Sequence, residues 1–127
     1  MLLTRKNSLP FARVVVRVAT LSVELENVLV DTGSATTILA ADRLSTIGIE
    51  PQGDETIHHI RGVGGREAVY RRRLDRLELG GRIFTDIKVD IGGMDYGFGI
   101  DGILGFDFLS RAGVILDLKA LTLDFAP

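Results

Sequence analysis

The stretch VLVDTGSATTIL, residues 28–39, carries an apolar segment directly into a carboxylate and hydroxyl groups. Residues 28–30 are continuously apolar, as in a strand covered on both faces. Asp31 follows at once, and then come Thr32, Gly33 and Ser34. A carboxylate at the end of a buried strand is costly unless it is hydrogen-bonded or shares a proton. The stretch therefore predicts either a tight turn that satisfies the acid, or a reactive acid.

The residues after Asp31 suit both explanations. Gly33 has no side chain, so its backbone can approach the carboxylate closely. Thr32 and Ser34 supply hydroxyls that can hold the turn and the acid. An Asx-type turn needs no more than this, because Asp, Ser and Gly are common in such turns. Other features of the sequence are needed to distinguish a structural turn from a reactive acid.

Elsewhere, short strands dominate the pattern. Apolar and polar residues alternate, or apolar runs occur, at 11–18, 21–25, 36–39, 57–60, 67–79, 83–91, 100–104, 114–118 and 121–125. Short helices are predicted at 40–47 and 106–111, with Gly48 and Gly113 as stops. The parity of the apolar residues changes between Leu74 and Leu77, which predicts a bulge or bend near 75–76. Many short strands without a βαβ rhythm predict an all-β closed barrel formed by a single domain, residues 1–127.

A glycine-tipped hairpin is predicted between residues 56 and 79. Its tip is Gly62, Val63, Gly64 and Gly65. Glycine adopts positive φ without steric cost, so a tight and mobile tip is expected.

The composition excludes several classes of function. The chain has 127 residues, no cysteine and a formal net charge of −2. Disulfides, thiolate catalysis and cysteine-bound metals are therefore excluded. No apolar run is long enough to span a bilayer, and residues 1–10 lack the apolar middle of a signal peptide. We expect a cytoplasmic location, although the chain could be the soluble domain of a longer or anchored protein.

Two further kinds of site are disfavoured. The basic run 71–73 is followed by Arg76 but interleaved with Asp75 and Glu78, which is typical of a solvated strand face rather than a nucleic-acid surface. His58 and His59 are adjacent in a predicted strand, so they point to opposite faces and do not readily bind one metal ion. No metal and no cofactor is expected. Ser34 has no histidine placed to activate it as a nucleophile.

Three features in this order resemble the retropepsin-like aspartic proteases, the single-domain group that includes the retroviral enzymes. They are the triplet Asp31-Thr32-Gly33, the glycine-tipped hairpin, and the segment Ile103-Leu104-Gly105 before a short helix. The resemblance extends over residues 14–125. It implies that Asp31 is the catalytic aspartate and that the hairpin tip is a flap that closes over substrate.

The resemblance also implies roles for neighbouring residues. Thr32 would lock two active-site loops together across a dimer, and Gly33 would accept a substrate hydrogen bond through its carbonyl. Ser34 matches a small or hydroxyl residue just outside the catalytic acid. The ψ-shaped turn that packs behind the catalytic loop would consist of Ile103, Leu104 and Gly105.

Catalysis of this kind needs two carboxylates, and the chain has one triplet. Asp101 is a poor partner, because Asp101-Gly102-Ile103 lacks the hydroxyl after the acid. The expected partner is Asp31 of a second copy in a C2 homodimer. Asp101 would then lie near the binding cleft, or else serve as a turn acid bonded to backbone amides.

The implied function is hydrolysis of an extended peptide or protein substrate by a water held between two Asp31 carboxylates. The alternative is a non-catalytic retropepsin-like module for dimerisation or peptide binding. Viral relatives join their subunits by a salt bridge that Ala35 and Phe106 cannot make here. Pocket residues are expected among Val28, Ile60, Val63, Ile100 and Ile103.

Overall fold

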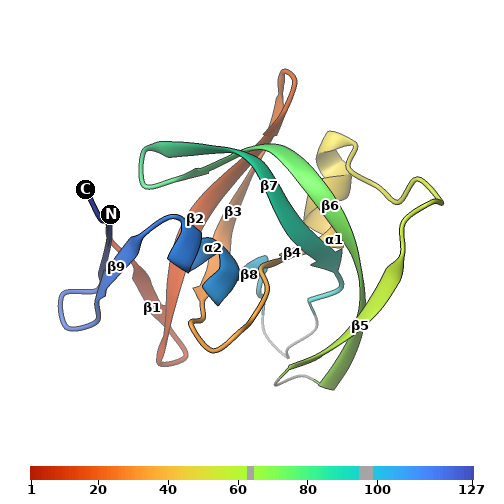
Figure 1. Ribbon diagram of the computed structural model, residues 1–127. Helices are drawn as coiled ribbons and strands as arrows, with labels where there is room; N and C mark the ends of the chain where they lie inside the picture. Colours follow the sequence, from red (N-terminus) through yellow and green to blue (C-terminus); the bar gives the residue numbers. More distant parts are fainter. Residues whose placement is uncertain (63–64, 95–98) are drawn as a thin grey trace.

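The computed structural model describes residues 1–62, 65–94 and 99–127 (Figure 1). Val63 and Gly64, at the tip of the expected hairpin, lie outside the described residues. In chain order the elements are β1 (Thr4–Lys6), β2 (Leu9–Val18), β3 (Leu21–Val30), β4 (Ile38–Ala40), α1 (Ala41–Leu44), the 3₁₀ turn η1 (Ser45–Ile47), β5 (Ile57–Gly62), β6 (Gly65–Leu79), β7 (Arg82–Gly92), β8 (Gly102–Leu104), α2 (Phe106–Arg111), β9 (Val114–Asp117) and β10 (Thr122–Phe125).

The large sheet closes on itself. Its strand order is β1-β2-β3-β8-β4-β7-β6-β5, and β2 also pairs with β6. This extra pairing joins the strands from β2 to β6 into a barrel, with β1 and β5 attached outside it (Figure 1). Closure removes most exposed strand edges. The prediction of an all-β closed barrel with short helices is confirmed.

A ψ-shaped crossing forms part of the barrel wall. β8 comes late in the chain but lies between β3 and β4. It runs parallel to β3 and antiparallel to β4. The segment that joins β3 to β4 therefore loops around the end of β8, and this segment contains the Asp31 triplet. The crossing brings residues 31–37 against residues 104–107.

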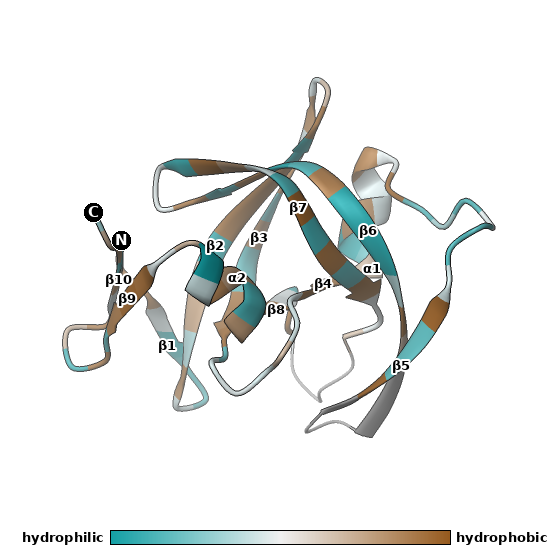
Figure 2. Cartoon of the chain, in the orientation of Figure 1, coloured by the Kyte–Doolittle hydropathy of each residue, from teal (hydrophilic) through white to brown (hydrophobic). Residues whose placement is uncertain are grey.

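The strands that form this crossing have two apolar faces. In β3, β4 and β8, Val28, Val30, Leu39 and Leu104 belong to the main core inside the barrel. Their neighbours in sequence point the other way, because side chains alternate along a strand. Of these neighbours, Ile38 and Ile103 form a second apolar cluster with Val69 of β6, and Leu29, Ile60 and Met94 pack against it. Figure 2 shows the alternation of hydrophobic and hydrophilic residues along β6 and β7.

The parity change predicted near residues 75–76 occurs without an inserted residue. The β6–β7 register is the same before and after Asp75. Opposite Asp75, Asp86 has a φ of 59°. Leu74 and Leu77 are both buried, so the two strands turn over together at this point. The irregularity is a shared bend.

The chain termini pair within one copy. The Met1 ammonium donates to the Leu123 carbonyl at 2.8 Å, and the Leu3 N–H donates to the Leu121 carbonyl at 2.8 Å. Residues 1–3 thus lie beside β10, which pairs with β9, and both termini emerge on one side of the molecule (Figure 1). The predicted β9–β10 hairpin is present, and the added N-terminal segment was not predicted.

Candidate active site

Asp31 lies at the end of β3, where its backbone is held by β8. Its N–H donates to the Leu104 carbonyl at 3.0 Å. By alternation Asp31 shares a face with Leu29 rather than with the core residue Val30. The side chain is half-buried. The strand thus delivers a carboxylate to the surface that carries the second apolar cluster.

Gly33 holds this carboxylate. Its N–H donates to Asp31 Oδ1 at 3.0 Å, and the Ser34 N–H donates to the Asp31 carbonyl at 3.2 Å. A Cβ atom at position 33 would lie 3.3 Å from Asp31 Oδ1, tighter than most carbon contacts. The absence of a side chain therefore lets the backbone reach the acid.

The Ile103-Leu104-Gly105 segment packs directly behind this loop. The Phe106 N–H donates to the Ser34 carbonyl at 2.7 Å, and Ser34 Oγ donates to the Thr36 carbonyl at 2.9 Å. A Cβ atom on Gly105 would lie 2.4 Å from the Thr36 carbonyl oxygen, which is sterically impossible without movement. Only glycine permits this approach.

A buried threonine fastens the loop to α2. Thr37 is fully buried, and its hydroxyl donates to Asp107 Oδ1 at 2.8 Å. The same hydroxyl accepts the Gly105 N–H at 3.0 Å. Asp107 also accepts the N–H groups of Thr37 at 3.3 Å and Phe108 at 2.7 Å. Sequence reasoning missed Thr37 and Asp107; the available signal was an acid in the first turn of the predicted helix.

Thr32 is different, because it is exposed. Among the described residues, no hydrogen bond involves its hydroxyl. Thr32 is therefore the member of the triplet whose side chain is left free at the surface of one copy.

The Asp101 carboxylate is hydrogen-bonded by neighbouring residues of the same chain. Its carboxylate accepts the Asn27 N–H at 3.1 Å and pairs with the Arg43 guanidinium at 3.1 Å. Its backbone also bonds Asn27 and Ala40. Of the two roles foreseen for Asp101, this geometry matches the turn acid, which fixes the entry to β8.

The residues expected to line a pocket fall into separate groups. Ile60 and Ile103 meet in the second apolar cluster, whereas Val28 belongs to the main core inside the barrel. Ile100 is buried and Val63 lies outside the described residues. Sequence reasoning missed Leu29. Because side chains alternate along a strand, a residue two positions before Asp31 shares its face, and this pattern would have identified Leu29.

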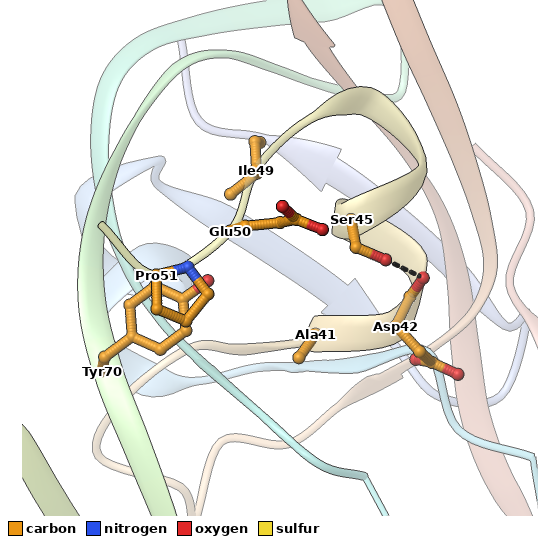
Figure 3. A pocket seen from close by; sticks show the side chains of 7 residues that line it. All are labelled: Ala41, Asp42, Ser45, Ile49, Glu50, Pro51 and Tyr70. Carbon is orange, nitrogen blue, oxygen red and sulfur yellow. Dashed lines mark hydrogen bonds between the residues drawn. The ribbon is translucent and has the colours of Figure 1, made fainter. Parts of the chain in front are cut away.

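A hollow of about 470 Å³ lies elsewhere, between α1–η1 and β6 (Figure 3). Its lining residues are Ala41, Asp42, Ser45, Ile49, Glu50, Pro51 and Tyr70. Burial raises the pKa of the Tyr70 hydroxyl. In the described part of the chain this hydroxyl is buried without a hydrogen-bond partner. None of the expected catalytic residues lines the hollow.

The described residues contain no group of three or more histidine, aspartate or glutamate side chains arranged to hold a metal ion. His58 and His59 are exposed neighbours in β5. Among the helices of residues 1–62, 65–94 and 99–127, none is long and apolar enough to cross a membrane.

Comparisons with known proteins agree with this geometry. A family model described as aspartyl protease matches residues 14–108, a segment that includes Asp31 and Gly105. The crystal structure of a retropepsin-like aspartic protease from Rickettsia conorii is similar to this chain, with a TM-score of 0.67 and 19% sequence identity. The match covers 97% of this chain and 96% of that chain. No curated protein matches the sequence.

Proposed function

Because this chain belongs to the aspartyl protease family and has a retropepsin-like fold, we propose that it is an aspartic endopeptidase. It acts as a C2 homodimer in which the Asp31 carboxylates of two copies face each other. The observation that carries this proposal is the half-exposed Asp31 carboxylate, held by the Gly33 N–H on a loop braced by Gly105.

When two carboxylates lie close together, one acts as the general base and the other as the general acid. Like charges at close range cannot both ionise, so the pair shares one proton, which is the established behaviour of aspartic-protease dyads in general. The ionised Asp31 takes a proton from water, and the protonated Asp31 donates to the peptide carbonyl oxygen. Water then attacks the carbonyl carbon to form a gem-diol. Proton transfer to the amide nitrogen breaks the C–N bond and releases an acid and an amine.

The free hydroxyl of Thr32 supports assembly from two copies. A hydroxyl without a partner in the described part of its own chain is available to bond the backbone of the facing loop. Ala35 and Phe106 are both exposed beside this loop, and Phe106 is 58% exposed. With these residues in place of a salt bridge, the seam between subunits would be held by apolar contact.

Substrate would lie extended between the β5–β6 hairpin and the second apolar cluster. An extended peptide can bond its main chain to loop and hairpin while alternate side chains fill pockets. Ile60 from the hairpin packs against the cluster that contains Ile103 from the floor. Closure of the hairpin, the proposed flap of Gly62, Val63, Gly64 and Gly65, would exclude water from the reacting bond.

The test is cleavage of a mixed peptide library at acid to neutral pH, read by mass spectrometry. We expect the wild type to cut and Asp31→Asn to lose all detectable cutting while it keeps the wild-type melting temperature. Asp75→Asn, at an exposed position in β6, is the matched control and should cut normally. Equal cutting by the wild type and Asp31→Asn would refute the proposal.

The same peptide library distinguishes the protease from the alternative, a non-catalytic module for dimerisation or peptide binding. A dimer that binds peptides but cuts none of them, under any condition tested, would be a non-catalytic module. A strict monomer over a wide concentration range would leave Asp31 without its partner and would refute the dimeric mechanism.

A further inference from the structure

One row of side chains crosses four neighbouring strand pairs on the face that carries the second apolar cluster. Leu29 lies opposite Ile103, and Ile103 lies opposite Ile38. Ile38 in turn lies opposite Asp90 in β7, and Asp90 lies opposite Arg71 in β6. Directly opposed residues point to the same face of a sheet. The apolar floor next to Asp31 therefore ends in an ion pair.

The members of this ion pair are buried to different extents. The Asp90 side chain is 3% exposed and the Arg71 side chain is 53% exposed, with Arg71 Nε 3.2 Å from Asp90 Oδ1. A buried carboxylate is costly without a partner, so Asp90 fixes Arg71 in place. Within the described part of the chain the pair uses Nε, which leaves the Nη donors of Arg71 for a further acceptor. The chemistry offered to a ligand here is cationic.

Further charged side chains lie in the neighbouring rows. Arg73 lies opposite Lys88 on the same face, and Arg73 pairs with Asp86 at 3.0 Å. Asp75 is in register with Asp86, so three cations and three acids lie at this end of the row and their formal charges balance. The cation offered to a ligand is therefore the Arg71 guanidinium itself, through the donors that Asp90 does not use.

We propose that Arg71, positioned by Asp90, selects substrates that carry an acidic side chain beside an apolar one. This inference rests on the proposed function, since it assigns a substrate class to the same cleft. Strands lie about 4.8 Å apart, so Asp90 in β7 is roughly 14 Å along the sheet from β3, the strand that ends at Asp31. An extended peptide advances about 3.3 Å per residue, which places the acidic residue about three to five positions from the scissile bond. Guanidinium binds carboxylate through two parallel hydrogen bonds.

The first experiment compares cleavage of peptide pairs that differ only by Glu or Gln at those positions, around a Phe–Leu centre. We expect the wild type to prefer Glu about tenfold in kcat/KM at low salt, and to lose part of that preference at high salt. Arg71→Gln should abolish the preference, and Arg71→Lys should keep only part of it. Arg13→Gln is the matched control: Arg13 pairs with Glu24 and is 54% exposed, but lies outside this row.

Asp90 is tested as a positioning residue. Asp90→Asn keeps the volume of the side chain but removes the charge that orients Arg71. We expect KM to rise several-fold more for the Glu peptide than for the Gln peptide, while kcat changes equally for both. A general loss of structure would lower activity toward both peptides and would contradict this role.

Binding separates this inference from the proposed hydrolysis. Fluorescein-labelled versions of the same peptide pairs are titrated into Asp31→Asn protein, with and without Arg71→Gln, and followed by anisotropy. A preference for the Glu peptide that depends on Arg71 supports the inference even if the wild type cuts no peptide. In that case only the proposed protease activity is refuted. Equal binding or cutting of the Glu and Gln peptides, or no binding to either, overturns the inference.

Discussion

At the scale of single residues, two glycines and one threonine shape the acidic loop. Gly33 lies close enough to bond the Asp31 carboxylate, and Gly105 packs against the backbone of residue 36. Thr37 supplies one hydroxyl to two partners across the crossing. A Cβ atom at position 105 would meet the Thr36 backbone, and one at position 33 would crowd the Asp31 carboxylate.

Tyr70 is the residue whose polar group is left unsatisfied among the described residues. A buried hydroxyl without a partner costs folding free energy. We therefore expect Tyr70→Phe to raise the free energy of unfolding by about 1 kcal/mol at neutral pH, measured by urea titration. A lower stability of Tyr70→Phe would show that the hydroxyl has a partner in the hollow of Figure 3.

The same substitution has a pH dependence with a defined sign. Burial raises the pKa of Tyr70 in the folded protein above its ordinary value of 10.0. The unfolded state therefore releases its proton first, and the stability due to Tyr70 is present below pH 10 and lost as pH rises through the folded pKa. Tyr70→Phe should lack this alkaline loss, so the stability difference between the variant and the wild type should widen above about pH 10.

At the scale of elements, strand alternation and the inserted β8 make the site. Alternation along β3 sends Val28 and Val30 into the barrel and Leu29 outward. The turn between β8 and α2 then packs directly against the backbone of the acidic loop. The bend shared by β6 and β7 keeps both the core and the charged outer row on continuous strands.

The packing of the β8–α2 turn gives a direct prediction. Gly105→Ala would place a Cβ atom 2.4 Å from the Thr36 carbonyl oxygen, so backbone must move. We expect the free energy of unfolding to fall by at least about 2 kcal/mol, measured by urea titration. The matched control is Gly93→Ala, where an added Cβ would have nothing within 4 Å. Equal stability of the two variants would mean that the turn and loop are not in contact.

At the scale of the whole molecule, one barrel holds half of the proposed dyad. The chain pairs its own termini, with residues 1–3 beside β10. Seam contacts in the proposed dimer would then come from the loops around Asp31, where Thr32, Ala35 and Phe106 are exposed.

Phe106 tests this seam. Its N–H is bonded to the acidic loop while its side chain is 58% exposed. We expect Phe106→Ala to raise the monomer–dimer Kd by about tenfold, through loss of buried apolar area, without lowering the melting temperature of the monomer. Ile83→Ala, at a 55% exposed position in β7, is the control and should leave Kd unchanged. Sedimentation equilibrium measures both constants, and identical Kd values would exclude Phe106 from the seam.

The sequence by itself determined the class of fold and the position of the acid. Alternation and glycine punctuation depend on local backbone geometry, so they predicted most of the strands, the hairpin and both short helices without knowledge of contacts, but not β1. Only the tertiary structure determined which distant residues contact one another across the barrel. The Thr37–Asp107 bridge, the engagement of Asp101 by Arg43 and the row that ends at Arg71 join residues far apart in the chain. Such contacts depend on strand order and register, which local patterns leave open.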